Sequence, residues 1–243
     1  MKTVVVGDVH GCNQEFQRLL RKIDFQVGHD RLLLTGDAFS RGPDPAGVWQ
    51  TIKETEAKMV LGNHDAKLQQ LLSEIVATKR PKHQNSDQEI TITKLLPFSD
   101  QLLPWLQNVP LYIETETFLL VHAGINPEKG LDQTTRDEFL TIRRWPPAPG
   151  IHGLRWHDFI THSNRTIIFG HDAPGGLICR NRPAESIENG NLPYLLGLDT
   201  GCVYGGQLSA CLLEECRLVN VESERIWFER QRSQTRTSDE IQK

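Results

Sequence analysis

The sequence predicts an α/β protein, and two observations carry that prediction. Between Val4 and Ile75, short apolar runs alternate with segments whose apolar residues recur at helical spacing. This alternation of strands and helices is typical of a parallel sheet with crossover helices. Later in the chain, short apolar runs are separated by turn residues, which indicates further strands that are largely antiparallel.

The first part of the chain repeats the order strand, charged turn, helix three times. From the apolar patterns we expect strands at 4–6, 32–35 and 58–61, and helices at 13–23, 48–52 and 68–75. Asn13 is a candidate N-cap of the first helix, because its side chain can accept a hydrogen bond from a first-turn amide. Each of these strands ends in a glycine that is followed within a few residues by Asp, Asn or His.

The second part is less regular. A polar segment at 78–89 contains a proline and predicts a loop, as does the polar segment at 180–192. Prolines make 145–150 irregular. We expect helices at 98–106 and 134–144, and strands at 111–114, 118–121, 166–169, 194–198, 207–213, 217–221 and 225–228. One domain is expected over 1–228, followed by a polar tail at 229–243 that lacks apolar periodicity and is predicted to be disordered.

Composition narrows the class of protein. Hydrophobic residues at 38% and charged residues at 24% suit a soluble globular protein. A net charge of −4 argues against a nucleic-acid binder but permits a small polyphosphate substrate, because a bound metal can supply positive charge. No apolar run approaches the roughly 20 residues of a membrane span, and no signal peptide is recognisable. The cysteines, five in number, include no C-x-x-C, so we expect reduced thiols, a cytoplasmic location and no cysteine-based zinc site.

The strand ends carry the chemistry. In an extended segment residues i and i+2 point the same way, so Asp8 and His10 would project together from the first strand. Side chains of the same kind follow other predicted strands, namely Asp37, Asn63 with His64, His122 and His171. Because the carboxyl ends of parallel strands share one edge of a sheet, we expect these side chains to form a single site.

This set of side chains predicts a metal centre. Imidazole nitrogens combined with carboxylate and amide oxygens suit manganese, iron or zinc better than an all-oxygen magnesium site. Asp37 follows the middle one of the first three strands, so its carboxylate is placed to bridge two ions about 3.5–4 Å apart. Such a pair of ions is the arrangement used for in-line phosphoryl displacement.

Several short blocks resemble, in order, the signature of the calcineurin-like metallophosphoesterases. They are Gly7-Asp8-Val9-His10-Gly11, Gly36-Asp37 with Arg41-Gly42, Gly62-Asn63-His64-Asp65, His122-Ala123-Gly124 and Gly170-His171. The resemblance is to the phosphoprotein-phosphatase-type branch, which includes bacterial diadenosine-tetraphosphate hydrolases. It extends from about Val4 to Leu213, and it implies a β-sandwich of mixed sheets flanked by helices in four layers, α/β/β/α.

The resemblance also implies roles for individual residues. Asp8, His10 and Asp37 would hold one metal ion, and Asp37, Asn63, His122 and His171 the other. Mn²⁺ is the first expectation, with Fe, Zn, Co and Ni as alternatives. A metal-bridging hydroxide would attack phosphorus. His64 would act as general acid and Arg41 would clamp the phosphate. A second arginine is expected; Arg144 is the first candidate and Arg143 the alternative.

One position indicates the substrate. Protein phosphatases of this type carry an Asp that orients the catalytic histidine, where this chain has Ser40. A small uncharged residue there resembles the symmetrically cleaving diadenosine-tetraphosphate hydrolases, which form two molecules of ADP. We therefore expect a small nucleotide polyphosphate substrate and neither a nucleic-acid nor a membrane partner. A protein phosphatase, a broad phosphomonoesterase, a capped RNA end as substrate and a catalytically silent metal-binding scaffold remain alternatives.

Overall fold

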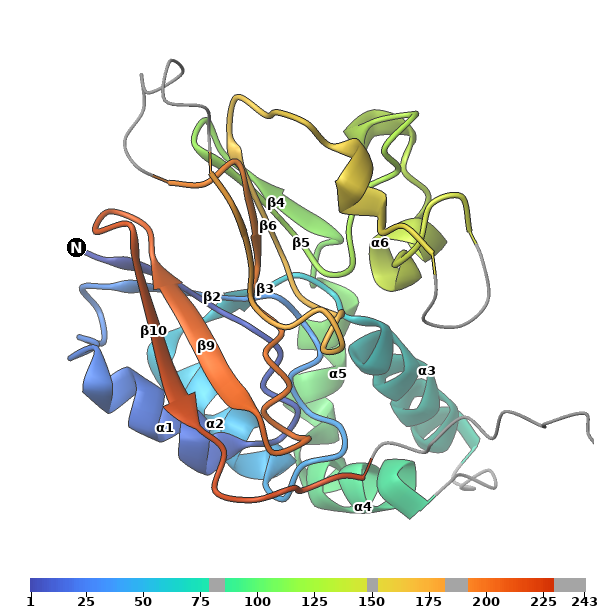
Figure 1. Ribbon diagram of the computed structural model, residues 1–243. Coiled ribbons are helices and arrows are strands. Elements are labelled where there is room, and N and C mark those ends of the chain that lie inside the picture. Colours follow the sequence, from blue (N-terminus) through green and yellow to red (C-terminus); the bar gives the residue numbers. More distant parts are fainter. Residues whose placement is uncertain (79–85, 148–152, 182–191, 230–243) are drawn as a thin grey trace, which may run out of the picture.

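Two mixed β-sheets, each of five strands, form the centre of the computed structural model (Figure 1), which describes residues 1–78, 86–147, 153–181 and 192–229. The first sheet has the order β10 (Arg217–Glu222), β9 (Gln207–Leu212), β1 (Thr3–Val6), β2 (Arg31–Leu34), β3 (Lys58–Met59). The second has the order β4 (Tyr112–Glu114), β5 (Phe118–Val121), β6 (Thr166–Phe169), β8 (Leu195–Gly197), β7 (Ile178–Arg180). The predicted mixed sheets are therefore confirmed.

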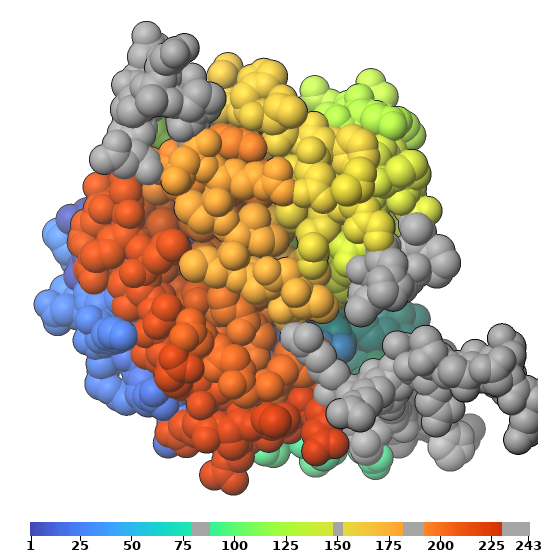
Figure 2. All heavy atoms as spheres, in the orientation of Figure 1, coloured from blue at the N-terminus to red at the C-terminus, as the bar shows by residue number. Residues whose placement is uncertain are grey.

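Parallel pairing at the centre of each sheet brings the functional strand ends to one edge. In the first sheet β1 pairs parallel with β2, and β2 with β3, whereas β9 pairs antiparallel with both β1 and β10. In the second sheet β5, β6 and β8 run parallel, and β4 and β7 are antiparallel edge strands. In the space-filling view (Figure 2), the red segment from β10 onward lies beside the orange segment that follows β6.

Strand β1 shows why the chain forms layers. Its side chains alternate between the two faces of the sheet. Val5 packs with Leu33 and Ile168 in an apolar layer between the sheets. Val4 and Val6 pack instead on the outer face, in a cluster that includes the helices. A strand that is buried on both faces reads as a continuous apolar run, which explains the Val4–Val6 sequence.

Helices cover the outer faces of both sheets, in agreement with the expected four layers. The helices on the first sheet are α1 (Asn13–Lys22), α2 (Pro45–Thr55), α3 (Asn63–Thr78), α4 (Ser86–Leu95) and α5 (Ser99–Gln107). The second sheet packs against α6 (Arg136–Thr141) and the short 3₁₀ helix Trp156–Phe159. Two further 3₁₀ turns lie at Leu96–Phe98 and Leu131–Gln133.

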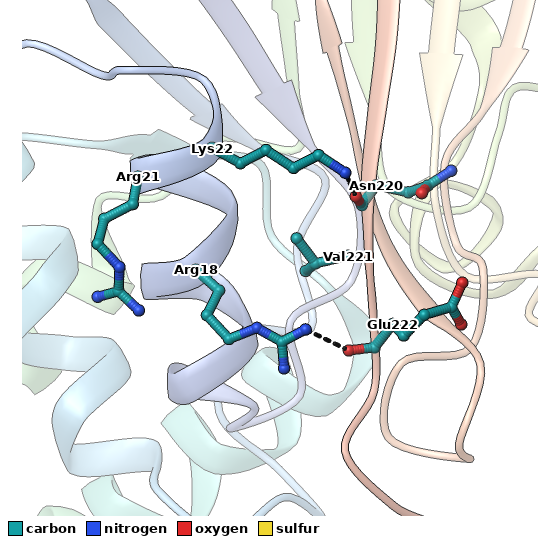
Figure 3. Close-up of a pocket in the computed structure, with 6 residues that line it drawn as sticks. All are labelled: Arg18, Arg21, Lys22, Asn220, Val221 and Glu222. Atoms are coloured by element: carbon teal, nitrogen blue, oxygen red, sulfur yellow. Dashed lines mark hydrogen bonds between the residues drawn. The ribbon is translucent and has the colours of Figure 1, made fainter.

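Basic side chains of α1 tie this helix to the edge of the first sheet. Lys22 Nζ donates to the Asn220 carbonyl at 2.8 Å, and an Arg18 guanidinium nitrogen donates to the Glu222 carbonyl at 3.2 Å (Figure 3). These residues and Arg21 border a surface hollow of about 560 Å³. Lys22 and Arg18 therefore satisfy carbonyl groups of the edge strand β10.

Several predicted elements need correction. Residues 225–228 form no strand and contain only a single bridge, between Ile226 and Tyr204. The helix predicted at 134–144 covers only Arg136–Thr141, capped by Thr135. The strand at 58–61 is shortened to Lys58–Met59, and β7 was not predicted.

The loop predicted at 78–89 is wrong from 86 onward, since α4 begins there, and 79–85 lie outside the described residues. Most of the predicted 180–192 loop, part of the 145–150 segment and all of the 229–243 tail except Glu229 also lie outside them. Asn13 does not cap α1, because the cap position is Cys12. Its amide donates instead to Asp44, the residue that caps α2.

Candidate metal centre and active site

The predicted ligands converge where β1, β2, β5 and β6 end. Ligand atoms of Asp8, His10 and Asp37 lie within 4.8 Å of one another, and so do those of Asp37, His122 and His171. Asp37 belongs to both groups, as its place on the middle strand predicted. These side chains are almost completely buried. The structure thus brings together two ligand groups that share one carboxylate.

Asp37 Oδ2 lies between the two groups. It is 3.7 Å from His10 Nε2 and 3.6 Å from His122 Nε2. Both separations exceed the length of a hydrogen bond. The other carboxylate oxygen, Oδ1, accepts the backbone N–H of His64 at 2.9 Å. One oxygen is therefore held by the backbone, and the second faces imidazole nitrogens on both sides.

The ring of His122 shows that this centre suits a cation. Its Nδ1 lies 2.8 Å from the carbonyl oxygen of Thr35, which can only accept, so Nδ1 carries the proton. Burial lowers the pKa of His122, which leaves Nε2 as a lone pair. This lone pair faces Asn63 Oδ1 at 3.1 Å and the Asp37 carboxylate. Acceptor atoms that converge without a proton between them fit a bound metal ion.

Asp8 is also oriented by hydrogen bonds, whereas the ring of His171 is not oriented in this way by any described residue. Asp8 accepts the Thr35 hydroxyl at 2.7 Å through Oδ1 and the backbone N–H of His171 at 3.0 Å through Oδ2. Both ring nitrogens of His171 are buried, and neither forms a hydrogen bond of ordinary geometry within the described chain. Hydrogen bonds like those of Asp8 orient a metal ligand and tune its basicity, and at the ring of His171 they are absent among the described residues. His171 thus also has a nitrogen available to an ion.

Electrostatics leave the site negative and its imidazoles neutral. Burial lowers the pKa of His10 to about 3 and holds that of His171 well below its ordinary value. Burial alone would raise the pKa of Asp37, but the imidazoles around it hold that pKa below its ordinary value. For Asp8, burial and then neighbouring carboxylates raise the pKa. An ionised Asp37 among neutral imidazoles attracts a divalent cation.

Backbone strain is concentrated at this site. The φ angles of His10, Asp37, Arg41 and His171 are 47°, 50°, 72° and 66°. Non-glycine residues rarely adopt positive φ, and such conformations cost of order 1–3 kcal/mol each. The surrounding structure must therefore hold these side chains in place, as is common at functional sites.

Two glycines leave room for the carboxylates. A Cβ at Gly170 would lie 1.9 Å from Asp8 Oδ1, and a Cβ at Gly62 would lie 2.2 Å from Asp37 Oδ1. Neither distance is possible between atoms that are not bonded. Both positions, Gly62 and Gly170, therefore require glycine, because any side chain there would overlap a carboxylate oxygen.

The predicted general acid lies at the rim of the centre. His64 is half-buried in the first turn of α3, and its ring centroid is 5.3 Å from that of His10, edge to face. Arg41 donates to the Tyr204 hydroxyl at 2.6 Å, and its guanidinium carbon lies 5.3 Å from the ring centroid of Phe228. His64 therefore borders the ligand groups without belonging to them. Arg41 is near enough for its charge to lower the pKa of His10, although burial is the larger cause.

The two candidates for the second arginine differ in position. Arg143 is exposed, and its guanidinium donates to the His171 carbonyl at 2.8 Å. Its charge lowers the pKa of both His122 and His171, although burial is the larger cause. Arg144 is only 5% exposed and forms a backbone bridge with Arg155. Arg143, the alternative candidate, is therefore in direct contact with His171, one of the candidate ligands.

Comparison with known proteins identifies the family. Calcineurin-like phosphoesterases match residues 1–187, which is most of the chain. The chain belongs to the calcineurin-like phosphoesterase family. Members are metal-dependent hydrolases of phosphoric esters or anhydrides, and the family implies a centre of two metal ions, for which the two ligand groups described above are the candidates.

Individual relatives cover almost the whole chain. A symmetrical bis(5'-nucleosyl)-tetraphosphatase of Proteus mirabilis is 38% identical over 272 residues, covering 89% of this chain and 96% of the relative. The protein of the same name from Vibrio parahaemolyticus is 28% identical over 267 residues, covering 90% and 97%.

Solved structures show the same fold. A crystal structure provisionally assigned as a diadenosine tetraphosphatase superposes with a TM-score of 0.69 at 29% identity, covering 91% of this chain and 93% of that one. A serine/threonine phosphatase from Saccharomyces cerevisiae, at 18% identity and a TM-score of 0.52, shows the fold alone. Within the described residues, no helix has the length and apolar character needed to span a membrane.

Two residues of the site were missed in the sequence. Thr35 contacts both ligand groups, through its hydroxyl to Asp8 and its carbonyl to His122. Its place directly after strand β2 was the available signal. Tyr204 holds Arg41 from a distant loop, and nothing near it in the sequence indicates this contact.

Proposed function

We propose that this phosphoesterase hydrolyses dinucleoside tetraphosphates symmetrically, converting diadenosine tetraphosphate into two molecules of ADP. The observation that carries the proposal is that relatives named for this reaction match about nine-tenths of this chain and nearly all of their own length. Ser40, an uncharged residue, agrees with that choice of substrate. The candidate metal centre supports phosphoanhydride hydrolysis in general.

We assign the metal ligands as the sequence predicted. Asp8, His10 and Asp37 would hold one ion, and Asp37, Asn63, His122 and His171 the second. Two divalent ions bound there would lower the pKa of a water molecule and shield phosphate charge. Mn²⁺ is our first choice among the borderline metals that this mixture of nitrogen and oxygen ligands suits.

The other residues bind substrate and move a proton. We assign His64 as the general acid, which gives its proton to the leaving phosphate oxygen; its half-buried ring at the rim can reach both substrate and solvent. Arg41 would bind phosphate oxygens through its planar guanidinium, with Tyr204 limiting the rotamers of the arginine. We propose Arg143 rather than Arg144 as the second phosphate ligand, because it is exposed beside His171.

The products of a single assay test the substrate. The purified chain is incubated with Mn²⁺ and diadenosine tetraphosphate, and the nucleotides are separated by ion exchange. ADP as the only product is expected. Equal amounts of ATP and AMP would show asymmetrical cleavage, and no turnover would contradict the proposed substrate.

Two controls make the assay specific. A phosphoserine peptide at the same concentration tests the protein-phosphatase alternative, and the peptide is expected to turn over far more slowly than the dinucleotide. Chelation of metal should abolish ADP formation, and added Mn²⁺ should restore it.

All five cysteines are unpaired, so we also propose that the enzyme works in a reducing compartment such as the cytoplasm.

A further inference from the structure

A second cluster of metal-type side chains lies where the first turn of α1 meets the loop before β9. It consists of Cys12, Glu15 and Cys202, and their two sulfurs and a carboxylate oxygen lie within 4.8 Å of one another. All three residues are at most 1% exposed. The two cysteines are far apart in sequence, so no spacing motif reveals the cluster, and the sequence predicted no site of this kind.

Glu15 is an unusual residue in this position, because buried carboxylates are rare unless they are paired. Its Oε1 accepts the Trp227 indole N–H at 3.0 Å and the Glu224 backbone N–H at 3.1 Å. Its Oε2 is buried and has no hydrogen-bond partner within the described residues. A buried acceptor without a partner costs free energy of about 1–3 kcal/mol, unless something else binds it.

The two thiols form a hydrogen bond with each other, and thiols are weak donors and acceptors. Cys12 Sγ makes a long contact of 3.8 Å with the carbonyl oxygen of His10. Cysteine sulfur and carboxylate oxygen are both ligands that zinc takes in proteins. Ligand atoms held tetrahedrally at about 2.0–2.3 Å from one zinc ion lie about 3.5–3.8 Å apart, so these atoms, which lie within 4.8 Å of one another, would have to draw together by up to roughly 1 Å to share an ion.

We propose that Cys12, Glu15 and Cys202 form a third metal site, which binds Zn²⁺ or a similar borderline cation and is separate from the two-metal centre. Binding would release the two thiol protons, because thiols bind zinc as thiolates. The metal ion would then be the partner that Glu15 Oε2 lacks among the described residues. With three protein ligands, a tetrahedral ion keeps one position for water.

The location gives this site a structural consequence. An ion there would join the start of α1 to the loop that contains Cys202 and Tyr204. Through Glu15 it would also join the segment that includes Glu224 and Trp227. Tyr204 is the residue that holds Arg41, so the ion would stiffen one wall of the active site. It would contact no substrate.

Cobalt distinguishes this site from the two-metal centre, whose ligands include no sulfur. The full chain with Cys179→Ser and Cys216→Ser, which removes both exposed cysteines, is reduced, freed of metal and titrated with Co²⁺. We expect a near-ultraviolet band from thiolate-to-cobalt charge transfer that saturates at one ion per chain. Absence of this band up to three equivalents would overturn the proposal.

Variants of the ligands locate the band. Cys202→Ser added to the same background should abolish it, and Glu15→Gln, which keeps the shape of the side chain, should weaken cobalt binding at least tenfold. Cys211→Ser is the matched control, because this thiol is buried elsewhere, and should leave the band unchanged. A band that persists without Cys202, or a Cys12–Cys202 disulfide in freshly purified protein, would contradict the assignment. Activity is not the readout, so failure here leaves the proposed reaction untouched.

Discussion

The hydroxyl of Ser40 lies 3.1 Å from Nδ1 of His10, inside the candidate metal centre. At this position protein phosphatases of the same branch carry an aspartate, and the sequence suggested that its loss concerns the catalytic histidine. The contact instead places Ser40 behind a proposed metal ligand. With Nδ1 donating to the hydroxyl, Nε2 of His10 keeps its lone pair, on the side that faces Asp37.

Ser40→Ala should therefore weaken metal binding. Removal of a residue that orients a ligand typically costs about 10- to 100-fold in metal affinity, and the lower end is expected because the contact is a neutral hydrogen bond. Calorimetric titration with Mn²⁺ measures the change. Ser73→Ala, which removes a hydroxyl bonded to a helix carbonyl of α3, is the control. Equal affinity in both variants would show that Ser40 does not orient His10.

His64→Gln should lower kcat for diadenosine tetraphosphate by about 10²- to 10⁴-fold, the usual contribution of a general acid. Mn²⁺ affinity should change little, because the His64 backbone N–H that bonds Asp37 is retained. Steady-state rates and metal content of the same preparation test both statements. His29→Gln alters an exposed histidine and serves as control. A variant as active as the parent would remove His64 from the mechanism.

Arg143→Ala and Arg144→Ala form a matched pair. The exposed Arg143 should bind phosphate, and the loss of a charged hydrogen bond worth about 1.5–3 kcal/mol lowers kcat/KM about 10- to 100-fold. Arg144 is buried, so its alanine variant should unfold at lower urea concentration while kcat/KM of the folded enzyme stays near that of the parent. The reverse pattern would restore Arg144 as the phosphate ligand.

Gly170→Ala tests the close packing behind the first ligand group. The new Cβ would overlap Asp8 Oδ1 and approach Thr35 Oγ1 to 2.7 Å, so Asp8 must move. Mn²⁺ affinity should fall at least tenfold, as measured by titration, with a corresponding loss of activity at limiting metal. At Gly130, where φ is 76°, alanine is strained but its Cβ meets no atom within 4 Å, so Gly130→Ala should lose some stability and still bind metal like the parent.

His157 should make stability depend on pH. Burial lowers its pKa from 6.5 to about 4, so between these values the unfolded chain binds a proton that the folded chain does not. Above pH 6.5 this titration therefore has no effect on the free energy of unfolding. As the pH falls from 6.5 toward 4, the free energy of unfolding decreases, with a slope that approaches about 1.4 kcal/mol per pH unit.

Urea unfolding of the metal-free chain at several pH values measures this slope. His157→Gln should reduce the slope by up to about 1.4 kcal/mol per pH unit, and part of the remainder comes from His10, His122 and His171, whose pKa values burial also lowers. His162→Gln, which changes an exposed histidine, should leave the slope unchanged. Equal slopes for the parent and the His157 variant would contradict the predicted titration.

The sequence by itself determined the strands β1 and β2 and the ligand groups at their ends. The reason is local: apolar runs form buried strands, a glycine ends each run, and the carboxyl ends of parallel strands share one edge. Asp37 could be recognised as the shared carboxylate from strand order alone. The resemblance then supplied roles for His64 and Arg41, which lie within the same short blocks.

Tertiary structure alone decided whatever depends on contacts between distant segments. Our proposal of Arg143 over Arg144 rests on the contact of the Arg143 guanidinium with the His171 carbonyl, and a sequence pattern could not separate the two adjacent residues. The pairing of Ile226 with Tyr204 replaces the predicted last strand by a single bridge. Cys12 and Cys202 meet only because β9 returns beside β1. Local periodicity holds no information about such pairings, since they arise from the packing of the whole chain.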